Sequence, residues 1–377
     1  MKASLLNYEN DNFVNSEKIS NSEVQVVLSF GDKDFIKSNG VYQKLRSKFP
    51  QAHILVGSTA GEINGSAMTE GDITTTVMGF ADTRIKSQDV NIADFNNSYE
   101  AGEYLLRCLE APDLAYVMVI SDGGQVNGSE LVRGINEATN YKIPVTGGLA
   151  GDGNKFESTL VGLNSEPSQG IIAAIGFYGT KLRVGHGSVG GWETFGPEMM
   201  VTKSTNNQLF EIENKSALGL YKKYLGEYAN ELPGSALLFP LSVKLPGKET
   251  PLVRTILSID FEKESMVFAG DIPEGSYVRF MKSNLDNLVD AATEAAEQCL
   301  SDGKSESTQL ALLVSCVGRK LVMNTRVEEE VEAVAEVLGS NAVITGFYSY
   351  GEICPLTSNS PAELHNQTMT ITTLTEA

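Results

Sequence analysis

Three Gly-rich turns in the sequence carry carboxylates that could contact a small polar ligand. The turns are GSTAGEI (57–63), GGLAGDG (147–153) and GFYSYGEI (346–353). They contain Glu62, Asp152 and Glu352. Glycine lets a backbone approach a ligand closely, and a carboxylate can bind an ammonium or hydroxyl group. The structural alternative is that these carboxylates accept hydrogen bonds from nearby backbone N–H groups and so hold the turns.

Polar residues in and near these turns are further candidate ligand contacts. Ser58 and Thr59 stand in the first turn, and Tyr350 stands in the third, where it could form an aromatic wall. Asn366 lies in a later loop and could add an amide to the same site. Hydroxyl and amide groups donate and accept hydrogen bonds, which suits a polar ligand.

The segment GHGSVGGWETFGP (185–197) is the densest cluster of distinctive residues. It contains His186 and the only tryptophan of the chain, Trp192. Histidine titrates near neutral pH and binds metals, so His186 is the histidine best placed for coordination or proton transfer. The alternative is again structural, because a lone histidine is often a satisfied packing residue. The other two, His53 and His365, stand beside expected strands and are expected to be structural.

Familiar catalytic and nucleotide motifs are absent from the sequence. It has no G-x-S-x-G elbow, dinucleotide fingerprint, P-loop, H-E-x-x-H or DxDxDG. We therefore expect no catalytic residue and no ATP or NAD site, although a hydrolase built from dispersed residues stays open. The four cysteines match neither a disulfide framework nor a zinc signature and are expected to be core thiols. Cys354-Pro355 is similar to the Cys-Pro pairs through which some thiolates bind haem.

An internal repeat predicts the architecture that would position the turns. Three times, an apolar run ends in a Ser, a helical segment follows, and a second apolar run ends in a Gly-rich turn. After each turn the chain continues as an alternating strand. A strand-helix-strand unit makes its two strands parallel with a right-handed crossover. The first strands are expected at 24–32, 114–124 and 310–320, and the alternating strands at 72–80, 169–179 and 365–374.

The region from about 180 to 305 is less regular and could be a degenerate fourth copy of the repeat. It is expected to contain helices at 214–228 and 284–301 and strands at 236–242, 255–261 and 266–272. The sequence thus predicts an α/β fold with mixed (α+β) sheets, in which repeated β-α-β-loop-β units form two related halves with a cleft between them. Ligands of open α/β sheets bind beyond the carboxyl ends of parallel strands, where all three turns are expected to lie.

Composition excludes several functions. The 377 residues include 29 Lys and Arg against 48 Asp and Glu, a net charge of −19, which argues against nucleic acid or an anionic membrane as a partner. With 41% apolar and 20% charged residues the chain is expected to be globular, with two or three domains. It contains no signal peptide or apolar run long enough to span a membrane, so we expect a soluble, cytoplasmic protein.

Seven motifs together closely resemble the FIST family of bacterial sensory proteins. The resemblance runs from about residue 24 to the C-terminus. It predicts a lead-in at 1–22, a FIST N-terminal domain at 23–215 and a FIST C-terminal domain at 216–377. The motifs are GSTAGEI (57–63), GGLAGDG (147–153), GHGSVGGWETFGP (185–197), FAGDIPEGSYVRFM (268–281), SCVGRK (315–320), GFYSYGEICP (346–355) and ELHNQTMT (363–370).

The resemblance implies a small-ligand sensor in signal transduction rather than an enzyme. Amino acids are the proposed ligands of the family, and some similar proteins bind haem and respond to nitric oxide. Many FIST domains are fused to signalling outputs such as kinase or cyclase modules. Because the two domains use nearly all of this chain, we expect it to signal in trans through a partner protein.

Three hypotheses for the site follow. In the first, an amino acid binds between the domains, with a turn carboxylate for its amine and Arg319 or Arg326 for its carboxylate. In the second, His186 is the axial ligand of a haem. In the third, the protein is a small-molecule hydrolase or isomerase that uses the turn carboxylates with His186. That enzyme would need a carboxylate of raised pKa in a closed pocket.

Overall fold

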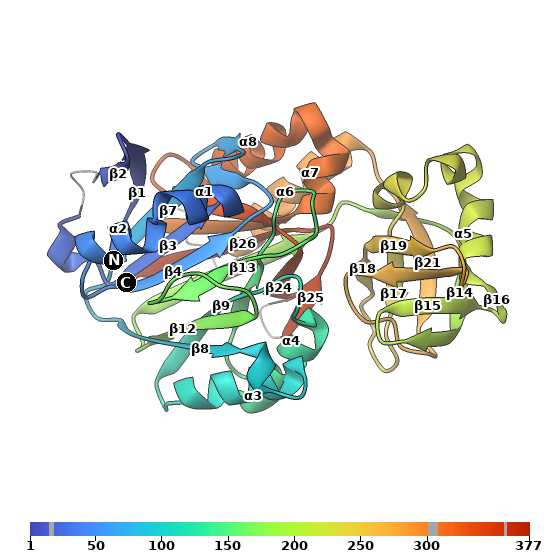
Figure 1. Ribbon diagram of the computed structural model, residues 1–377, viewed down its shortest axis with the longest axis horizontal. Helices are drawn as coiled ribbons and strands as arrows, with labels where there is room; N and C mark the ends of the chain where they lie inside the picture. The colour runs from blue at the N-terminus through green and yellow to red at the C-terminus, as the bar shows by residue number, and fades with distance from the viewer. Residues whose placement is uncertain (15–18, 301–307, 358–359) are drawn as a thin grey trace.

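The computed structural model describes residues 1–14, 19–300, 308–357 and 360–377. Most of the chain forms a body of three mixed sheets, and residues 193–282 form a separate lobe beside it (Figure 1). The mixed α/β class and the two-domain arrangement predicted from the sequence are confirmed. The expected helix end near Gly303 and part of the expected lead-in lie outside the described residues.

The predicted repeat is confirmed, since three units with one plan build the three sheets. In each unit the first strand pairs in parallel with the second and antiparallel with the alternating strand. A leading strand pairs with the alternating strand and extends the sheet. The leading strands are β1 (Lys2–Glu9), β8 (Arg84–Asn91) and β13 (Leu182–Val189); the first strands are β3 (Val26–Gly31), β9 (Leu114–Ser121) and β22 (Leu310–Cys316); the second strands are β4 (His53–Ser58), β10 (Val145–Leu149) and β23 (Val343–Ser349); the alternating strands are β7 (Ile73–Gly79), β12 (Ile171–Tyr178) and β26 (Met369–Glu376).

Two glycines of the repeat are required by the close approach of these strands. Gly147 lies opposite Val119, and Gly346 lies opposite Leu313, at matching points of two units. A Cβ atom would lie 1.8 Å from the Val119 carbonyl oxygen at Gly147 and 1.9 Å from that of Leu313 at Gly346. No larger residue fits at either point without moving the neighbouring strand.

Each unit also gives a short strand to a neighbouring unit. After its Gly-rich turn the first unit forms β5 (Glu62–Asn64), which pairs with β23 of the third unit. The third unit forms β24 (Gly351–Pro355), which pairs with β10 of the second. The second forms β11 (Val161–Leu163), which pairs with β4 of the first. The exchange therefore closes a cycle of three. Further short strands at the sheet edges are β2 (Asn12–Val14), β6 (Ala67–Thr69) and β25 (Ala362–His365).

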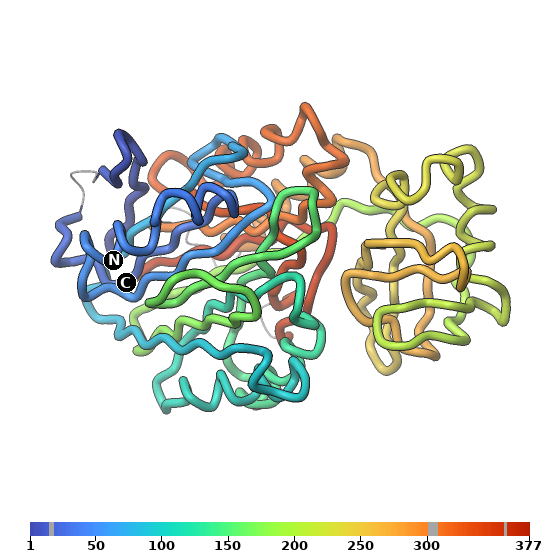
Figure 2. Tube along the Cα trace, in the orientation of Figure 1, coloured from blue at the N-terminus to red at the C-terminus, as the bar shows by residue number. Residues whose placement is uncertain are grey.

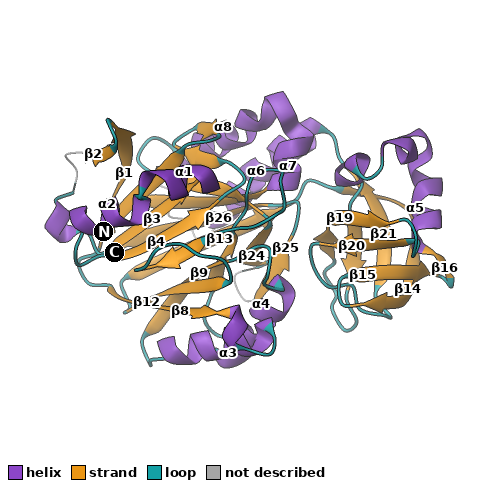
Figure 3. Cartoon of the chain, in the orientation of Figure 1, coloured by secondary structure: helices purple, strands orange, loops and turns teal. Residues whose placement is uncertain are grey.

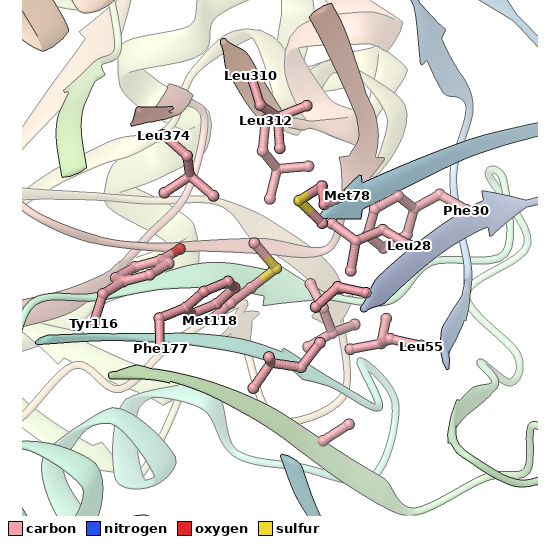
Figure 4. Packing of buried hydrophobic residues seen from close by; sticks show 14 of the residues in the cluster. Leu28, Phe30, Leu55, Met78, Tyr116, Met118, Phe177, Leu310, Leu312 and Leu374 are labelled. Carbon is pink, nitrogen blue, oxygen red and sulfur yellow. The ribbon is translucent and has the colours of Figure 1, made fainter. Parts of the chain in front are cut away.

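The inner faces of the three sheets share one apolar core (Figure 4). Leu28, Met118 and Leu312 come from the first strands of the three units and are fully buried. Phe30 stacks on Phe347 with ring centroids 4.4 Å apart, which joins the first sheet to the third. The apolar runs recognised in the sequence are thus buried on both faces, as expected for strands inside a layered fold.

Helices cover the outer faces of the sheets (Figure 3). α3 packs on α4 over the second sheet, and α6 packs on α8 over the third. The helices of the body are α1 (Lys33–Asn39), α2 (Val41–Lys48), α3 (Ser98–Leu109), α4 (Gly128–Ala138), α6 (Leu285–Leu300), α7 (Val317–Met323) and α8 (Val327–Leu338), with 3-10 turns at Asn21–Glu23, Ile92–Asp94 and Asn324–Arg326. No helix among the described residues combines the length and the apolar character that a membrane crossing requires.

The lobe is not a fourth copy of the repeat. Its strands form an eight-stranded sheet in which every pair within residues 193–282 is antiparallel, so it has no β-α-β crossover. The boundary expected between residues 215 and 216 falls inside this lobe, at β16. Its elements are β14 (Glu193–Thr205), β15 (Gln208–Ile212), β16 (Lys215–Ser216), α5 (Ala217–Leu225), 3-10 turns at Gly226–Glu231 and Gly234–Leu238, β17 (Leu241–Lys244), β18 (Leu252–Arg254), β19 (Ile256–Asp260), β20 (Ser265–Phe268) and β21 (Tyr277–Lys282).

The chain passes between the body and the lobe twice, before β14 and after β21 (Figure 2). A few polar contacts also join the two parts. The buried Arg254 donates from Nη1 to the Leu364 carbonyl of the body at 2.8 Å. Lys248 forms an ion pair with Glu363 at 2.9 Å. The lobe has its own apolar core, so these contacts hold two separately packed parts together.

Phe347→Ala is expected to lower the free energy of unfolding by about 3–5 kcal/mol, because it removes a fully buried ring from the core shared by the sheets. Urea denaturation measures this change. The control is Phe261→Ala in the lobe, where the ring is 54% exposed and the expected loss is below about 1 kcal/mol. Equal losses in the two variants would show that the sheets do not depend on this contact.

Candidate functional site

The three Gly-rich turns meet at one place in the body. Because each unit passes a strand to its neighbour, the ends of the second strands are drawn together and their backbones bond to one another. The hydrogen bonds run from Ala60 N to Tyr348 O (2.8 Å), from Gly151 N to Ser58 O (3.0 Å) and from Tyr350 N to Leu149 O (3.1 Å). The side-chain hydroxyl of Ser58 also accepts from Leu160 N at 2.8 Å, so Ser58 helps to hold the first turn against the second.

Asp152 is fully engaged by its neighbours. Its Oδ2 accepts from Lys33 Nζ at 2.9 Å and from the backbone N–H groups of Glu157 and Ser158 at 3.1 and 2.9 Å. Its Oδ1 accepts from the hydroxyl of Tyr350. Burial alone would raise the pKa of Asp152, but the bonds from Ser158, Tyr350 and Lys33 outweigh it and lower the pKa. This carboxylate orients Tyr350 and the loop after the second turn.

Glu352 is also satisfied, although it is ringed by neutral groups. Its carboxyl group accepts from Ser349 Oγ at 2.6 Å and from Thr368 N and Oγ1 at 3.2 and 2.9 Å. Burial raises its pKa to about 8 against these hydrogen bonds. Asn366 follows His365, which lies opposite Glu352 in the neighbouring strand, and is buried with Nδ2 bonded to the His365 carbonyl at 2.9 Å.

Glu62 is the carboxylate that the surrounding protein leaves incomplete. Thr59 Oγ1 donates to its Oε1 at 2.6 Å, whereas Oε2 is buried and has no hydrogen-bond partner among the described residues. Burial raises the pKa of Glu62 to about 8. Glu62 lines a cavity of about 210 Å³, here called the Glu62 pocket. Other residues of this pocket are Asp32, Thr59, Glu70, Asn154, Val317, Lys320 and Leu321.

A larger cavity, the interlobe cleft, lies between the body and the lobe. Its volume is about 370 Å³, and both parts of the protein line it. From the body, Phe156 stacks on Tyr350 with ring centroids 4.5 Å apart. From the lobe, Asp271 reaches the cleft and accepts from Asn127 Nδ2 at 3.0 Å. The cleft also includes the loop from Gly123 to Gly128, Asn206, Asn207, Leu257 and Phe268.

The remaining predicted site residues lie away from both cavities. Arg319 is fully buried and pairs with Glu330 at 2.8 Å, with further bonds to backbone carbonyls. Trp192 donates from Nε1 to the Gln367 carbonyl at 3.0 Å. Its ring packs against the apolar core between the third sheet and the helices α6 and α8. His186 lies in β13, the edge strand of the third sheet. The structure therefore brings Ser58, Thr59, Glu62, Asp152 and Tyr350 together and leaves these three apart.

The two cavities do not offer an axial ligand for haem. None of the lining residues of the Glu62 pocket or the interlobe cleft is a His or Cys. Cys354 is fully buried, and burial raises the pKa of its thiol, which disfavours the thiolate that would bind iron. His365 is buried and bonded through Nε2 to the Cys354 carbonyl at 2.8 Å. Nor do the described residues contain a cluster of three or more His, Cys, Asp or Glu suited to a metal ion.

The enzyme hypothesis requires a turn carboxylate of raised pKa in a pocket and requires His186 beside it, and the structure meets only the first requirement. Glu62 is a carboxylate of raised pKa beside a cavity, but His186 does not line that cavity. No paired acid and base therefore results from the residues that the sequence suggested.

Sequence reasoning missed several residues of the two cavities. Asp271 stands in the motif FAGDIPEG, which carried the family resemblance, and that motif was the available signal. Asp32, which lines the Glu62 pocket, directly follows the first strand of the first unit, a place where ligands of α/β sheets commonly bind. Lys33, the next residue, lines neither cavity but holds Asp152. Phe156 had no such signal, because it lies in an irregular loop.

Arg319→Ala is expected to lower the free energy of unfolding by about 3–5 kcal/mol, because it leaves the buried Glu330 carboxylate unpaired. Chemical denaturation measures the loss. The control is Arg326→Ala, which removes an exposed ion pair with Asp286 and Glu329 and is expected to leave stability nearly unchanged. A stable Arg319→Ala protein with impaired ligand binding would instead favour the ligand role first expected for Arg319.

Glu352→Gln is expected to alter how stability depends on pH. The folded protein holds the Glu352 proton up to about pH 8, whereas the unfolded chain loses it near 4.5. Stability from this group is therefore present below pH 4.5 and is lost as the pH rises toward 8. Wild type should lose stability relative to the variant across that window. Urea denaturation of both proteins checks this, because groups common to both cancel in the difference. A pH-independent difference would contradict the assignment.

The model of the FIST N domain matches residues 25–215, and that of the FIST C domain matches residues 217–355. A curated relative, the uncharacterized protein MJ1623 of Methanocaldococcus jannaschii, is 24% identical over an alignment of 241 residues that covers 56% of this chain and 45% of the relative. The chain thus spans less than half the length of that relative.

Among solved structures, a cyanuric acid hydrolase from A. caulinodans aligns over 95% of this chain and 91% of its own, with 8% identity and a TM-score of 0.34. The two family models carry the assignment, since together they span the body and the lobe and include all three Gly-rich turns. The chain belongs to the FIST family of sensory, small-ligand-binding signalling proteins.

Proposed function

We propose that this protein senses an amino acid or a similar small metabolite in the interlobe cleft. The observation that supports this best is that residues of both the body and the lobe line the cleft. A ligand shifts a conformational equilibrium only if it contacts the two states differently. A ligand held between two separately packed parts meets that condition, because its contacts change when the lobe moves against the body.

The chemistry of the cleft suits an amino acid. Asp271 supplies a carboxylate for the ammonium group. The carboxylate of the ligand would face the start of α4 at Gly128, where backbone N–H groups and the helix dipole favour negative charge. Phe156, Tyr350 and Leu257 offer apolar surface to the side chain. A volume of about 370 Å³ lies within the usual range of small-molecule sites.

In the first hypothesis from the sequence, an arginine binds the carboxylate of the ligand. Arg319 is held by Glu330, and Arg326 is held by Asp286 and Glu329. Asp152 acts on the cleft indirectly, since it fixes the hydroxyl of Tyr350 and so the ring that stacks on Phe156. The second turn therefore supports the site through Asp152, whereas the third turn contributes the ring of Tyr350 to the cleft itself.

The signal would pass to a partner protein through the position of the lobe. The partner in this proposal is a signalling protein in trans, such as a kinase or cyclase. Exposed aromatic residues on the lobe, among them Tyr228, Phe261 and Tyr277, give a partner apolar contacts whose position depends on the lobe.

Asp271→Asn is expected to weaken amino-acid binding by at least about tenfold, because it removes the anion that meets the ammonium group. Isothermal titration of the common amino acids into wild type and variant measures the affinities. The control is Glu274→Gln, a nearby exposed carboxylate of the lobe that does not line the cleft. No heat with any amino acid would reject this class of ligand. Equal binding by wild type and Asp271→Asn would reject the cleft as its site.

A further inference from the structure

Glu62 and Glu352 are counterparts in the strand exchange. Glu62 begins β5 and lies opposite Phe347 of the third unit, and Glu352 lies in β24 opposite Gly148 of the second unit. Each accepts a hydrogen bond of 2.6 Å from a hydroxyl three residues earlier in its turn. Both side chains are at least 99% buried. The chain thus contains the same local arrangement twice.

The two carboxyl groups differ at their second oxygen. In Glu352, Thr368 donates to Oε2 from both its backbone N–H and its hydroxyl. In Glu62, Oε2 has no such donor among the described residues. The backbone N–H of Asp72 lies close enough to lower the pKa of Glu62 but forms no hydrogen bond to Oε2. A buried polar atom without a partner is costly, so the ionised form of Glu62 lacks a donor at Oε2.

The Glu62 pocket supplies the space for that donor, which meets Oε2 once the buried carboxyl group turns toward the pocket. The pocket has a volume of about 210 Å³ and is lined by Glu62, Asp32 and Glu70. Its basic side chain, Lys320, is already held by the Ala60 carbonyl at 2.5 Å and by an ion pair with Glu70. Carboxylates therefore outnumber the lysine among the lining residues. Val317 and Leu321 add apolar surface for an alkyl group.

We propose that the Glu62 pocket binds a small organic ammonium ion, of the alkylamine class, whose N–H group donates to Glu62 Oε2. This site is separate from the interlobe cleft, and the proposal does not rest on the function proposed for that cleft. An anion would face three carboxylates in the pocket. A metal ion would need a ligand cluster that the described residues do not provide.

Binding should displace a proton from Glu62. The groups that face its carboxyl are Asp32 and Asp72, which raise its pKa, and Lys320 and Glu70, which line the same pocket. At pH 7 a carboxyl group with a pKa of about 8 is mostly protonated. An ammonium ion beside it favours the charged form, so each bound ion would release roughly 0.9 proton at that pH.

Titration of propylamine into the whole protein tests the proposal. We expect saturable binding, in roughly the millimolar range for so small a ligand. Calorimetry at about pH 7 in two buffers of different ionisation enthalpy measures the proton released. Glu62→Gln is expected to weaken propylamine binding at least about tenfold and to abolish the release. Glu352→Gln, the matched variant of the counterpart carboxyl group, should leave both unchanged.

Further titrations distinguish charge recognition in this pocket from apolar binding and from binding in the interlobe cleft. Propanol, which has the same length but no charge, should bind at least about tenfold more weakly than propylamine. Asp271→Asn should leave propylamine binding unchanged, because Asp271 lines only the other cavity. If Glu62→Gln does not fold, the wild-type affinity for propylamine should still rise with pH toward about 8 and then level off. Absent binding, equal binding by Glu62→Gln, or a flat pH profile would each overturn the proposal.

Discussion

The strand exchange among the three units is the constraint on which the rest of the structure depends. β5, β24 and β11 each complete the sheet of a neighbour, so no unit has a finished sheet of its own. The exchange forces the three Gly-rich turns to cross between units at one place, where their backbones bond to each other. The same crossing encloses the carboxyl groups of the turns and separates two cavities beside them. Fold and candidate site therefore have one origin.

The sequence predicts the parts of this fold that are local. The strands, the helices between them and the parallel pairing follow from apolar runs and turn residues within each unit. The exchanged strands could not be predicted, because β5 has three residues and pairs with a strand about 280 positions away. The antiparallel lobe was missed as a separate domain for a similar reason. Its strands are short, and no Pro- or Ser-rich linker sets it apart from the body.

The site shows the same division between local pattern and distant contact. Glu62, Asp152 and Glu352 look alike in sequence, yet Lys33 neutralises one, Thr368 completes another and the third lacks a donor at Oε2. Their partners come from other units, so the turn sequences alone could not rank them. Arg319 shows the same limit. The sequence suggests it as a cation for the carboxylate of a ligand, whereas its pairing with Glu330 in the interior is visible only in the structure.

The loop that follows the second turn is a partition between two compartments. Gly153 and Asn154 face the Glu62 pocket, and Phe156 to Thr159 face the interlobe cleft. Asp152 fixes the position of this loop, because its carboxylate accepts hydrogen bonds from Lys33, Ser158 and Tyr350, one residue from each unit. Whatever displaces this partition from one side reshapes the compartment on the other. By thermodynamic reciprocity, occupants of the two compartments would then report on each other, and the protein could register a coincidence of two chemical conditions rather than the level of one.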